Sequence, residues 1–277
     1  MMETQGRRKI VVALAPVGRE IASPSINPLS PEAIAQEVFA CAEAGASMVH
    51  LHVRDKEGNQ TEDLTEFSST LDLIRQASDI IIQGSTGGVT TLTREERCVS
   101  LNDPRVEVAS LNMGSANVGE GVYINTLPDI RFWARRIGEK GIVPELEIFE
   151  GGMVSNIARL LQDRSLTPPF YCNCVLGFEG PLPANPHSLY FLQSLLPEDV
   201  PWGIIHDGRQ DFSLLAMALA MGATVVRVGF EDSVFLAPGK AARTNVELVS
   251  RVVELIRCIG YDVATPAEAR ALLNIKH

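Results

Sequence analysis

The order of apolar and polar positions divides the chain into short segments that alternate between strand-like and helix-like patterns. Apolar, β-branched runs bounded by turn residues predict eight strands, at Lys9–Ala15, Ser47–Val53, Ile80–Ser85, Val106–Met113, Val143–Phe149, Tyr171–Leu176, Trp202–His206 and Thr224–Phe230. Apolar residues at helical spacing predict helices at Pro31–Ala44, Leu64–Ala77, Thr93–Val99, Leu127–Lys140, Met153–Leu161, His187–Leu195, Phe212–Met221 and Arg243–Ile259. Such alternation is typical of a parallel sheet built from βαβ units.

Eight repeats in 277 residues predict a single (β/α)8 TIM-barrel domain over residues 1–277, since such barrels run about 250 residues. An open dinucleotide-binding sheet is the alternative, but the segment Pro16–Glu20 after the first strand lacks its glycine fingerprint. Ser30 before Pro31 is typical of a helix start. Gly45 and Gly222 each follow a helical segment, where we expect them to end the helix.

Charge and composition narrow the class of protein. The formal net charge is −10, and the only cluster of basic residues is Arg7–Lys9, whereas nucleic-acid binders usually present a basic face. The five cysteines are scattered and odd in number, unlike the disulfide framework of a secreted domain, so we expect a cytoplasmic protein. The longest mostly apolar stretch, Phe212–Val226, is shorter than the about 20 residues a membrane helix needs.

Polar residues collect where the predicted strands end, which is where (β/α)8 barrels carry their active sites. His50 and His52 are two apart on one strand, so both imidazoles point to the same face. We predict that they bind a divalent metal ion; the alternative is a pair of hydrogen-bonded core histidines. Glu231, at the end of the last strand, is the predicted third ligand, because a carboxylate commonly completes a catalytic zinc site.

The neighbours of Glu231 allow two interpretations. Arg227 and Glu231 share one strand face, with Gly229 between them leaving room. They can frame the metal site, or form an internal salt bridge with no metal. Asp232 can serve as a general base that Arg227 keeps ionised, or it can merely cap the following turn.

Other strand ends carry weaker signals. The glycine-rich segment Gln83–Gly88 can hold an anion through its amides and hydroxyls, although a plain structural turn is the more frequent role. Ser110 and Asn112 share a face and can contact the same ligand or their neighbouring strands. Glu145 and Glu147 can orient a histidine or pair with a barrel arginine. The cysteines at 172 and 174 are more typical of small buried side chains than of metal ligands.

Taken together, these motifs resemble those of the β-keto acid cleavage enzymes, whose type member is the 3-keto-5-aminohexanoate cleavage enzyme of lysine fermentation. The resemblance runs over nearly the whole chain. The matching segments are Val17–Glu20, Glu43–Ala46, His50–Arg54, Gln83–Gly88, Ser110–Gly114, Pro144–Phe149 and Arg227–Asp232.

The resemblance implies a zinc-bearing (β/α)8 barrel, usually a homotetramer, that converts a β-keto acid and acetyl-CoA into acetoacetate and a new acyl-CoA. It implies zinc ligation by His50, His52 and Glu231. Asp232 matches the base that deprotonates the substrate, with Arg227 as its partner. The matching substrate-binding positions are Ser85, Gly88, Ser110 and Asn112, and Glu20 matches a carboxylate that meets a substrate amino group.

Three departures from the type member concern the substrate. Ser110 replaces a threonine and keeps the hydroxyl, whereas the first loop and the turn His206–Arg209 differ more and bear on the tail of the keto acid. Two other functions remain open on the same residues. One is a zinc-dependent aldolase or lyase without CoA, and the other is a metabolite-binding sensor, against which a base beside the metal argues.

Overall fold

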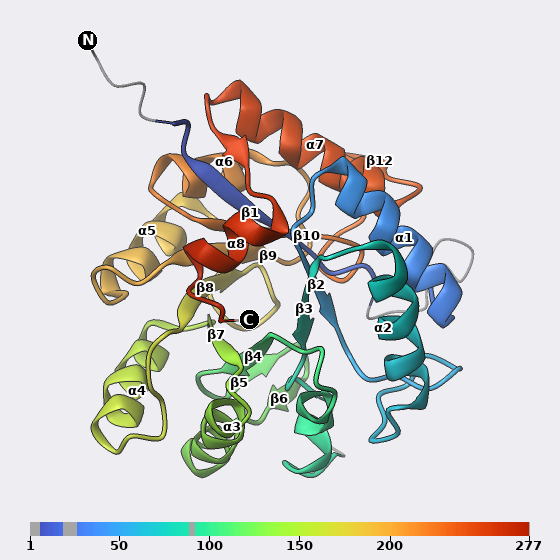
Figure 1. Ribbon diagram of the computed structural model, residues 1–277. Coiled ribbons are helices and arrows are strands. Elements are labelled where there is room, and N and C mark those ends of the chain that lie inside the picture. The colour runs from blue at the N-terminus through green and yellow to red at the C-terminus, as the bar shows by residue number, and fades with distance from the viewer. Residues whose placement is uncertain (1–5, 19–26, 89–91, 277) are drawn as a thin grey trace.

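Eight parallel strands form a closed barrel in the computed structural model, which describes residues 6–18, 27–88 and 92–276 (Figure 1). The barrel strands are β1 (Lys9–Leu14), β2 (Met48–Leu51), β3 (Ile81–Gly84), β4 (Val108–Asn112), β7 (Val143–Ile148), β8 (Tyr171–Leu176), β9 (Trp202–His206) and β10 (Val225–Val228). Each pairs in parallel with the next, and β1 closes the barrel by pairing with β10, Val11 opposite Val225. The predicted barrel and its eight strands are therefore confirmed.

Helices surround the barrel as predicted, with one exception. They are α1 (Pro31–Ala44), α2 (Thr65–Ala77), α3 (Leu127–Glu139), α4 (Gly151–Gln162), α5 (Pro186–Leu195), α6 (Ser213–Ala220) and α7 (Asn245–Cys258). The Ser30 side chain accepts from the Ala33 amide at the start of α1, and Gly45 ends that helix in the left-handed conformation at φ 119°. The prediction of a helix at Thr93–Val99 is wrong in type, because Glu96–Asn102 (η1) is 3-10 helix with a kink at Cys98.

Three segments contain strands or helices that the sequence pattern did not predict. The segment predicted as a loop after the fourth strand contains an antiparallel hairpin of β5 (Ala116–Val118) and β6 (Gly121–Tyr123). A second hairpin, β11 (Phe235–Ala237) with β12 (Lys240–Ala241), follows β10. The C-terminal segment forms β13 (Asp262–Val263), which pairs with the start of β1, and then α8 (Pro266–Leu272).

Helix α8 lies across the end of the barrel where the strands begin, as Figure 1 shows. Its Ala269 and Leu273 pack on the inward-facing strand residues, among them Val11, Met48 and Ile81. A larger apolar cluster fills the space between the outer faces of the strands and the helices. The barrel interior is thus closed at one end, and the opposite end is left for the polar residues of the strand termini.

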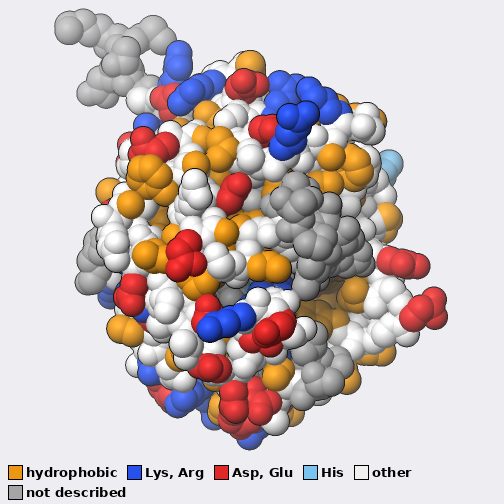
Figure 2. Space-filling model, turned by 90° about the vertical axis from the view of Figure 1, so that its right-hand side faces the viewer, with side chains coloured by type: hydrophobic (Ala, Val, Ile, Leu, Met, Phe, Trp, Pro, Cys, Tyr) orange, Lys and Arg blue, Asp and Glu red, His pale blue; other side chains and the backbone are white. Residues whose placement is uncertain are grey.

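Within the described residues, no helix is both long and apolar enough to cross a membrane. On the face shown in Figure 2, acidic and basic side chains are interspersed with apolar and uncharged ones, and neither sign covers the face continuously.

Candidate metal centre and cavity

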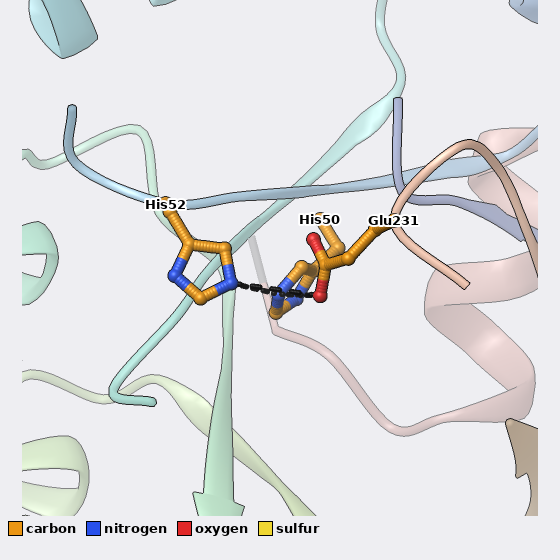
Figure 3. A group of neighbouring side chains, drawn as sticks. All are labelled: His50, His52 and Glu231. Carbon is orange, nitrogen blue, oxygen red and sulfur yellow. Dashed lines mark hydrogen bonds and ion pairs between the residues drawn. The ribbon is translucent and has the colours of Figure 1, made fainter. Parts of the chain in front are cut away.

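The side chains of His50, His52 and Glu231 converge at the open end of the barrel (Figure 3). His50 lies on β2, His52 follows that strand, and Glu231 follows β10. The two Nε2 atoms are 3.3 Å apart, and Glu231 Oε1 lies 3.6 Å from the first and 3.5 Å from the second. Three ligand atoms of the predicted metal site therefore form a nearly equilateral triangle.

The dimensions of this triangle fit a small divalent ion. With bonds of about 2.0–2.1 Å in tetrahedral geometry, ligand atoms lie about 3.3 Å apart, close to the three distances between His50, His52 and Glu231. Burial, the largest influence, lowers the pKa of His50 to about 3 although Glu231 opposes it, so the imidazole is neutral and its nitrogen free to coordinate. The residues present can hold a metal ion.

A hydrogen-bonded group outside the triangle orients each histidine. Gln83 Oε1 lies 2.9 Å from His50 Nδ1, so that nitrogen carries the hydrogen when Nε2 binds a metal. Gln83 in turn donates to Glu145 and, at 3.1 Å, to the hydroxyl of Tyr171. The carboxamide of Gln60 lies 3.0 Å from His52 Nδ1 and can play the same part with its oxygen turned to the ring.

Arg227 links Glu231 to Asp232. Its Nε and Nη2 donate to the two oxygens of Asp232 at 3.0 and 2.5 Å, and Nη2 lies 3.3 Å from Glu231 Oε1. Burial disfavours its charge, but Asp232 and Glu231 outweigh that and hold the pKa of Arg227 well above its usual range. The salt bridge proposed as an alternative to a metal site is therefore present beside the triad.

Gly229, which follows β10, allows the chain to place Glu231 at the barrel mouth. Gly229 has φ 148°, and a Cβ there would lie 2.0 Å from the carbonyl oxygen of Ala15 at the end of β1. No other residue allows this close approach of the two backbones. The amide of Glu231 then donates to that same carbonyl, at 3.2 Å, which holds the carboxylate toward the histidines.

The triad opens into a cavity of ≈ 820 Å³ at the barrel mouth. Its wall contains seven of the predicted site residues: His50, His52, Ser85, Gly88, Asn112, Arg227 and Glu231. Asp232 and Ser110 lie behind that wall, at 5% and 1% exposure. Ser110 supports the glycine-rich loop, since Thr86 donates to its backbone carbonyl at 2.5 Å and its hydroxyl lies 3.5 Å from that of Ser85.

Glu145 and Glu147 have different surroundings. Glu145 bonds Gln83, Tyr171 and Asn173 and so supports His50 through Gln83. Glu147 accepts from Asn112 Nδ2 at 2.7 Å and lies 3.8 Å from an Nη atom of Arg227. Burial, with repulsion from Glu145, raises the pKa of Glu147 to about 8, so this cavity residue carries a proton at neutral pH.

Sequence reasoning missed two residues, Tyr123 of the β5–β6 hairpin and Arg97 of η1. Tyr123, at the end of β6, enters the cavity wall. Arg97 holds it there: the guanidinium bonds Thr86, Ile124 and Asn125 and stacks on the ring of Trp133 with its carbon 4.2 Å from the ring centre. Arg97 is the sequence feature that could have indicated this contact, because it lies among buried residues of the predicted helix Thr93–Val99.

The remaining predictions concern Glu20 and the cysteines at 172 and 174. Glu20 lies outside the described residues. Cys172 and Cys174 are free and buried, as the sequence predicted for small buried side chains.

Comparison with known proteins shows similarity to β-keto acid cleavage enzymes over nearly the whole chain. The profile of the "beta-keto acid cleavage enzyme" family matches residues 9–275. A 3-keto-5-aminohexanoate cleavage enzyme of Fusobacterium nucleatum is 36% identical over 97% of this chain and 98% of its own. A 3,5-dioxohexanoate:acetyl-CoA acetone transferase of Paraburkholderia graminis is 32% identical over 98% and 97%.

A solved structure shares the fold. The binary complex of ObcA with oxaloacetate superposes with a TM-score of 0.76 at 23% identity, over 91% of this chain and 68% of that one. The family profile and the two relatives cover nearly every residue from which the barrel and its site are built. The chain belongs to the β-keto acid cleavage enzyme family.

Proposed function

We propose that this protein is a zinc-dependent β-keto acid cleavage enzyme that converts a β-keto acid and acetyl-CoA into acetoacetate and a new acyl-CoA. The observation that carries the proposal is the triangle of His50, His52 and Glu231, which opens into a large cavity with the Arg227–Asp232 pair beside it. Family membership supports the same activity. The single barrel would be the whole catalytic domain.

The metal we propose is zinc, because two imidazoles and one carboxylate, with a fourth position open to the cavity, form a usual donor set for a catalytic zinc ion. When bound, zinc would supply Lewis acidity to the ketone oxygen of the substrate. Gln83 orients the ring of His50 so that Nε2 faces His52 and Glu231, with which it would hold the ion.

The roles we propose for the remaining residues follow from membership of the family. Asp232 takes the proton from the carbon next to the ketone, and Arg227 keeps that carboxylate ionised and oriented. The resulting carbanion attacks the acetyl-CoA thioester, CoA passes to the substrate carbonyl, and carbon–carbon cleavage releases acetoacetate. Substrate binding is assigned to the residues Ser85, Gly88, Ser110 and Asn112, and contact with an amino tail to Glu20.

The experiment that tests this function is a substrate panel. Purified protein is incubated with acetyl-CoA and cationic, neutral or acidic β-keto acids, and acetoacetate and the new acyl-CoA are measured by mass spectrometry. We expect both products with at least one substrate, their loss when zinc is stripped, and recovery when it is restored. Substrate consumption without acetyl-CoA would indicate an aldolase or lyase, and undiminished turnover without metal would refute the zinc centre.

The tail specificity has its own test. With Glu20→Ala we expect weaker use of a cationic substrate and unchanged use of the neutral and acidic ones, because an amino group would lose its carboxylate partner. An equal loss across the three classes would contradict the role assigned to Glu20. A preference for 3-keto-5-aminohexanoate in the parent protein would fit a place in lysine fermentation.

We further propose a homotetramer in the cytoplasm. Helix α5 exposes Tyr190, Phe191 and Leu195 at 63%, 47% and 41%, an apolar surface suited to contact between subunits. The cysteines of the described residues are all free, as expected in a reducing compartment. Light scattering of the purified protein tests the assembly, and fractionation of the source cells tests the location.

A further inference from the structure

The hydroxyl of Tyr123 lies among hydrogen-bond donors. Asn112 Nδ2 donates to it at 3.2 Å and Arg97 Nη2 at 3.4 Å, and the backbone amide of Gly88 is a third partner. The same Nδ2 of Asn112 also donates to Glu147 at 2.7 Å. A phenol oxygen accepts through two lone pairs, so these donors fill its capacity as an acceptor.

The hydrogen of this hydroxyl is left for another partner. Among the described residues, the hydrogen bonds of Tyr123 have it as the acceptor, and the side chain lines the cavity. Burial raises its pKa to about 12, so the group keeps its hydrogen at any physiological pH. The side chain is partly exposed, so a ligand in the cavity can reach the hydroxyl and accept its hydrogen.

The hydroxyl also lies near Ser85 and His52. A Cβ built on Gly87 would lie 2.8 Å from Tyr123 Oη, 3.2 Å from Ser85 Oγ and 3.8 Å from His52 Cε1. One small volume therefore borders the tyrosine, the serine and a metal-binding histidine. The absence of a side chain at Gly87 keeps that volume open.

Two backbone amides of the glycine-rich loop form hydrogen bonds to the hydroxyls of Ser85 and Tyr123. The amide of Gly87 donates to Ser85 Oγ at 3.0 Å, and that of Gly88 bonds the oxygen of Tyr123. A hydroxyl that accepts from an amide becomes a stronger donor itself. The loop thus presents polarised O–H groups to the cavity, and the ligand chemistry that suits them is an anionic oxygen.

We propose that Tyr123 is a substrate-binding residue whose hydroxyl donates a hydrogen bond to the carboxylate of the β-keto acid. This rests on the proposed function. Hairpin β5–β6 brings the tyrosine into the site, and Arg97 anchors it from behind. The carboxylate is the feature that all β-keto acids share, so Tyr123 reads the acid group and leaves the tail to other residues.

The test compares Tyr123→Phe with the parent in zinc-loaded protein. The phenylalanine ring keeps the packing against Arg97 and Phe149 and removes only the hydroxyl. Calorimetry measures the affinity of each protein for acetoacetate and for its neutral methyl ester. We expect acetoacetate to bind about tenfold more weakly or worse to the variant, because the variant lacks the hydrogen bond to the charged carboxylate. The ester should lose much less.

Kinetics give the second readout. In Tyr123→Phe we expect KM for the β-keto acid to rise while KM for acetyl-CoA and the zinc content stay at the parental values. Equal losses for acetoacetate and its ester, or unchanged affinity for acetoacetate, would overturn the role of Tyr123. A parent protein that consumes no β-keto acid would instead refute the proposed function, which makes the two failures distinguishable.

Discussion

Gln83 offers the sharpest test of the metal centre, because it touches His50 and no other ligand of the triad. Gln83→Leu removes the oxygen that lies 2.9 Å from His50 Nδ1, together with the donor to Glu145 and Tyr171. Leucine keeps most of the buried volume. His50 is 2% exposed, so water has little access to its Nδ1–H once the glutamine is gone.

The loss of these contacts should change both the metal affinity and the free energy of unfolding. Loss of a partner that orients a metal-binding histidine typically weakens metal affinity about 10–100-fold, which corresponds to about 1.4–2.7 kcal/mol. The unpaired Nδ1–H of His50 and the lost bonds of Glu145 should lower the free energy of unfolding by about 1–3 kcal/mol. Both effects should appear in the same variant.

A matched control separates the two effects. Tyr171→Phe removes a hydroxyl that bonds Gln83 and, at 2.8 Å, Glu145, but it leaves the contact between Gln83 and His50. Zinc affinity is measured by competition with a chromophoric chelator, and stability by urea unfolding. We expect Tyr171→Phe to lose stability and keep its zinc affinity. Parental zinc affinity in Gln83→Leu, or an equal loss of affinity in both variants, would refute the reasoning.

Three further predictions concern other parts of the molecule. Gly87→Ala places a Cβ 2.8 Å from the Tyr123 oxygen, so kcat/KM should fall about tenfold to a hundredfold at parental zinc content; a parental kcat/KM would contradict the clash. Glu147, with its pKa raised from 4.5 to about 8, holds a proton more tightly when folded; in urea titrations of metal-free protein, the free energy of unfolding should therefore fall as pH rises from 4.5 to 8, by up to about 1.4 kcal/mol per pH unit, with a smaller slope in Glu147→Gln. Arg270→Met breaks ion pairs with Asp79 and Glu107 near the starts of β3 and β4; urea unfolding should show a loss of about 3 kcal/mol, while a large loss of zinc affinity would contradict a purely structural role.

The barrel strands were predictable because they are buried on both faces. Strands such as β1 and β8 are almost wholly buried and read as continuous apolar runs, which no turn or surface helix imitates. Helix α8 is short, and its one clear signal is the capping box of Thr265 and Glu268. Its role in closing the barrel depends on contacts with Val11 and Met48, which are remote in sequence and leave no local pattern.

The residues of the candidate site also differ in how far their positions could be predicted from the sequence. His50 and Glu231 owe their positions to strand register, because the end of β2 and the end of β10 must meet at the same rim once the barrel closes through β1. Residue spacing and strand-end position therefore predicted that these side chains converge. Tyr123 owes its position to a hairpin of three-residue strands that folds back over the rim, and to an arginine 26 residues earlier in the chain.

Nothing in the spacing of the hairpin residues fixes that fold-back, so the sequence predicted only a loop. Strand pairing constrains the two parts of the site differently. The metal triad and its supporting glutamine are built on β2, β3 and the end of β10, where a change of register would destroy the barrel. The hairpin and the loops around the cavity can change without disturbing strand pairing. Substitutions that redirect this enzyme between β-keto acids should therefore lie in those loops, whereas substitutions at the strand ends should abolish metal binding and activity together.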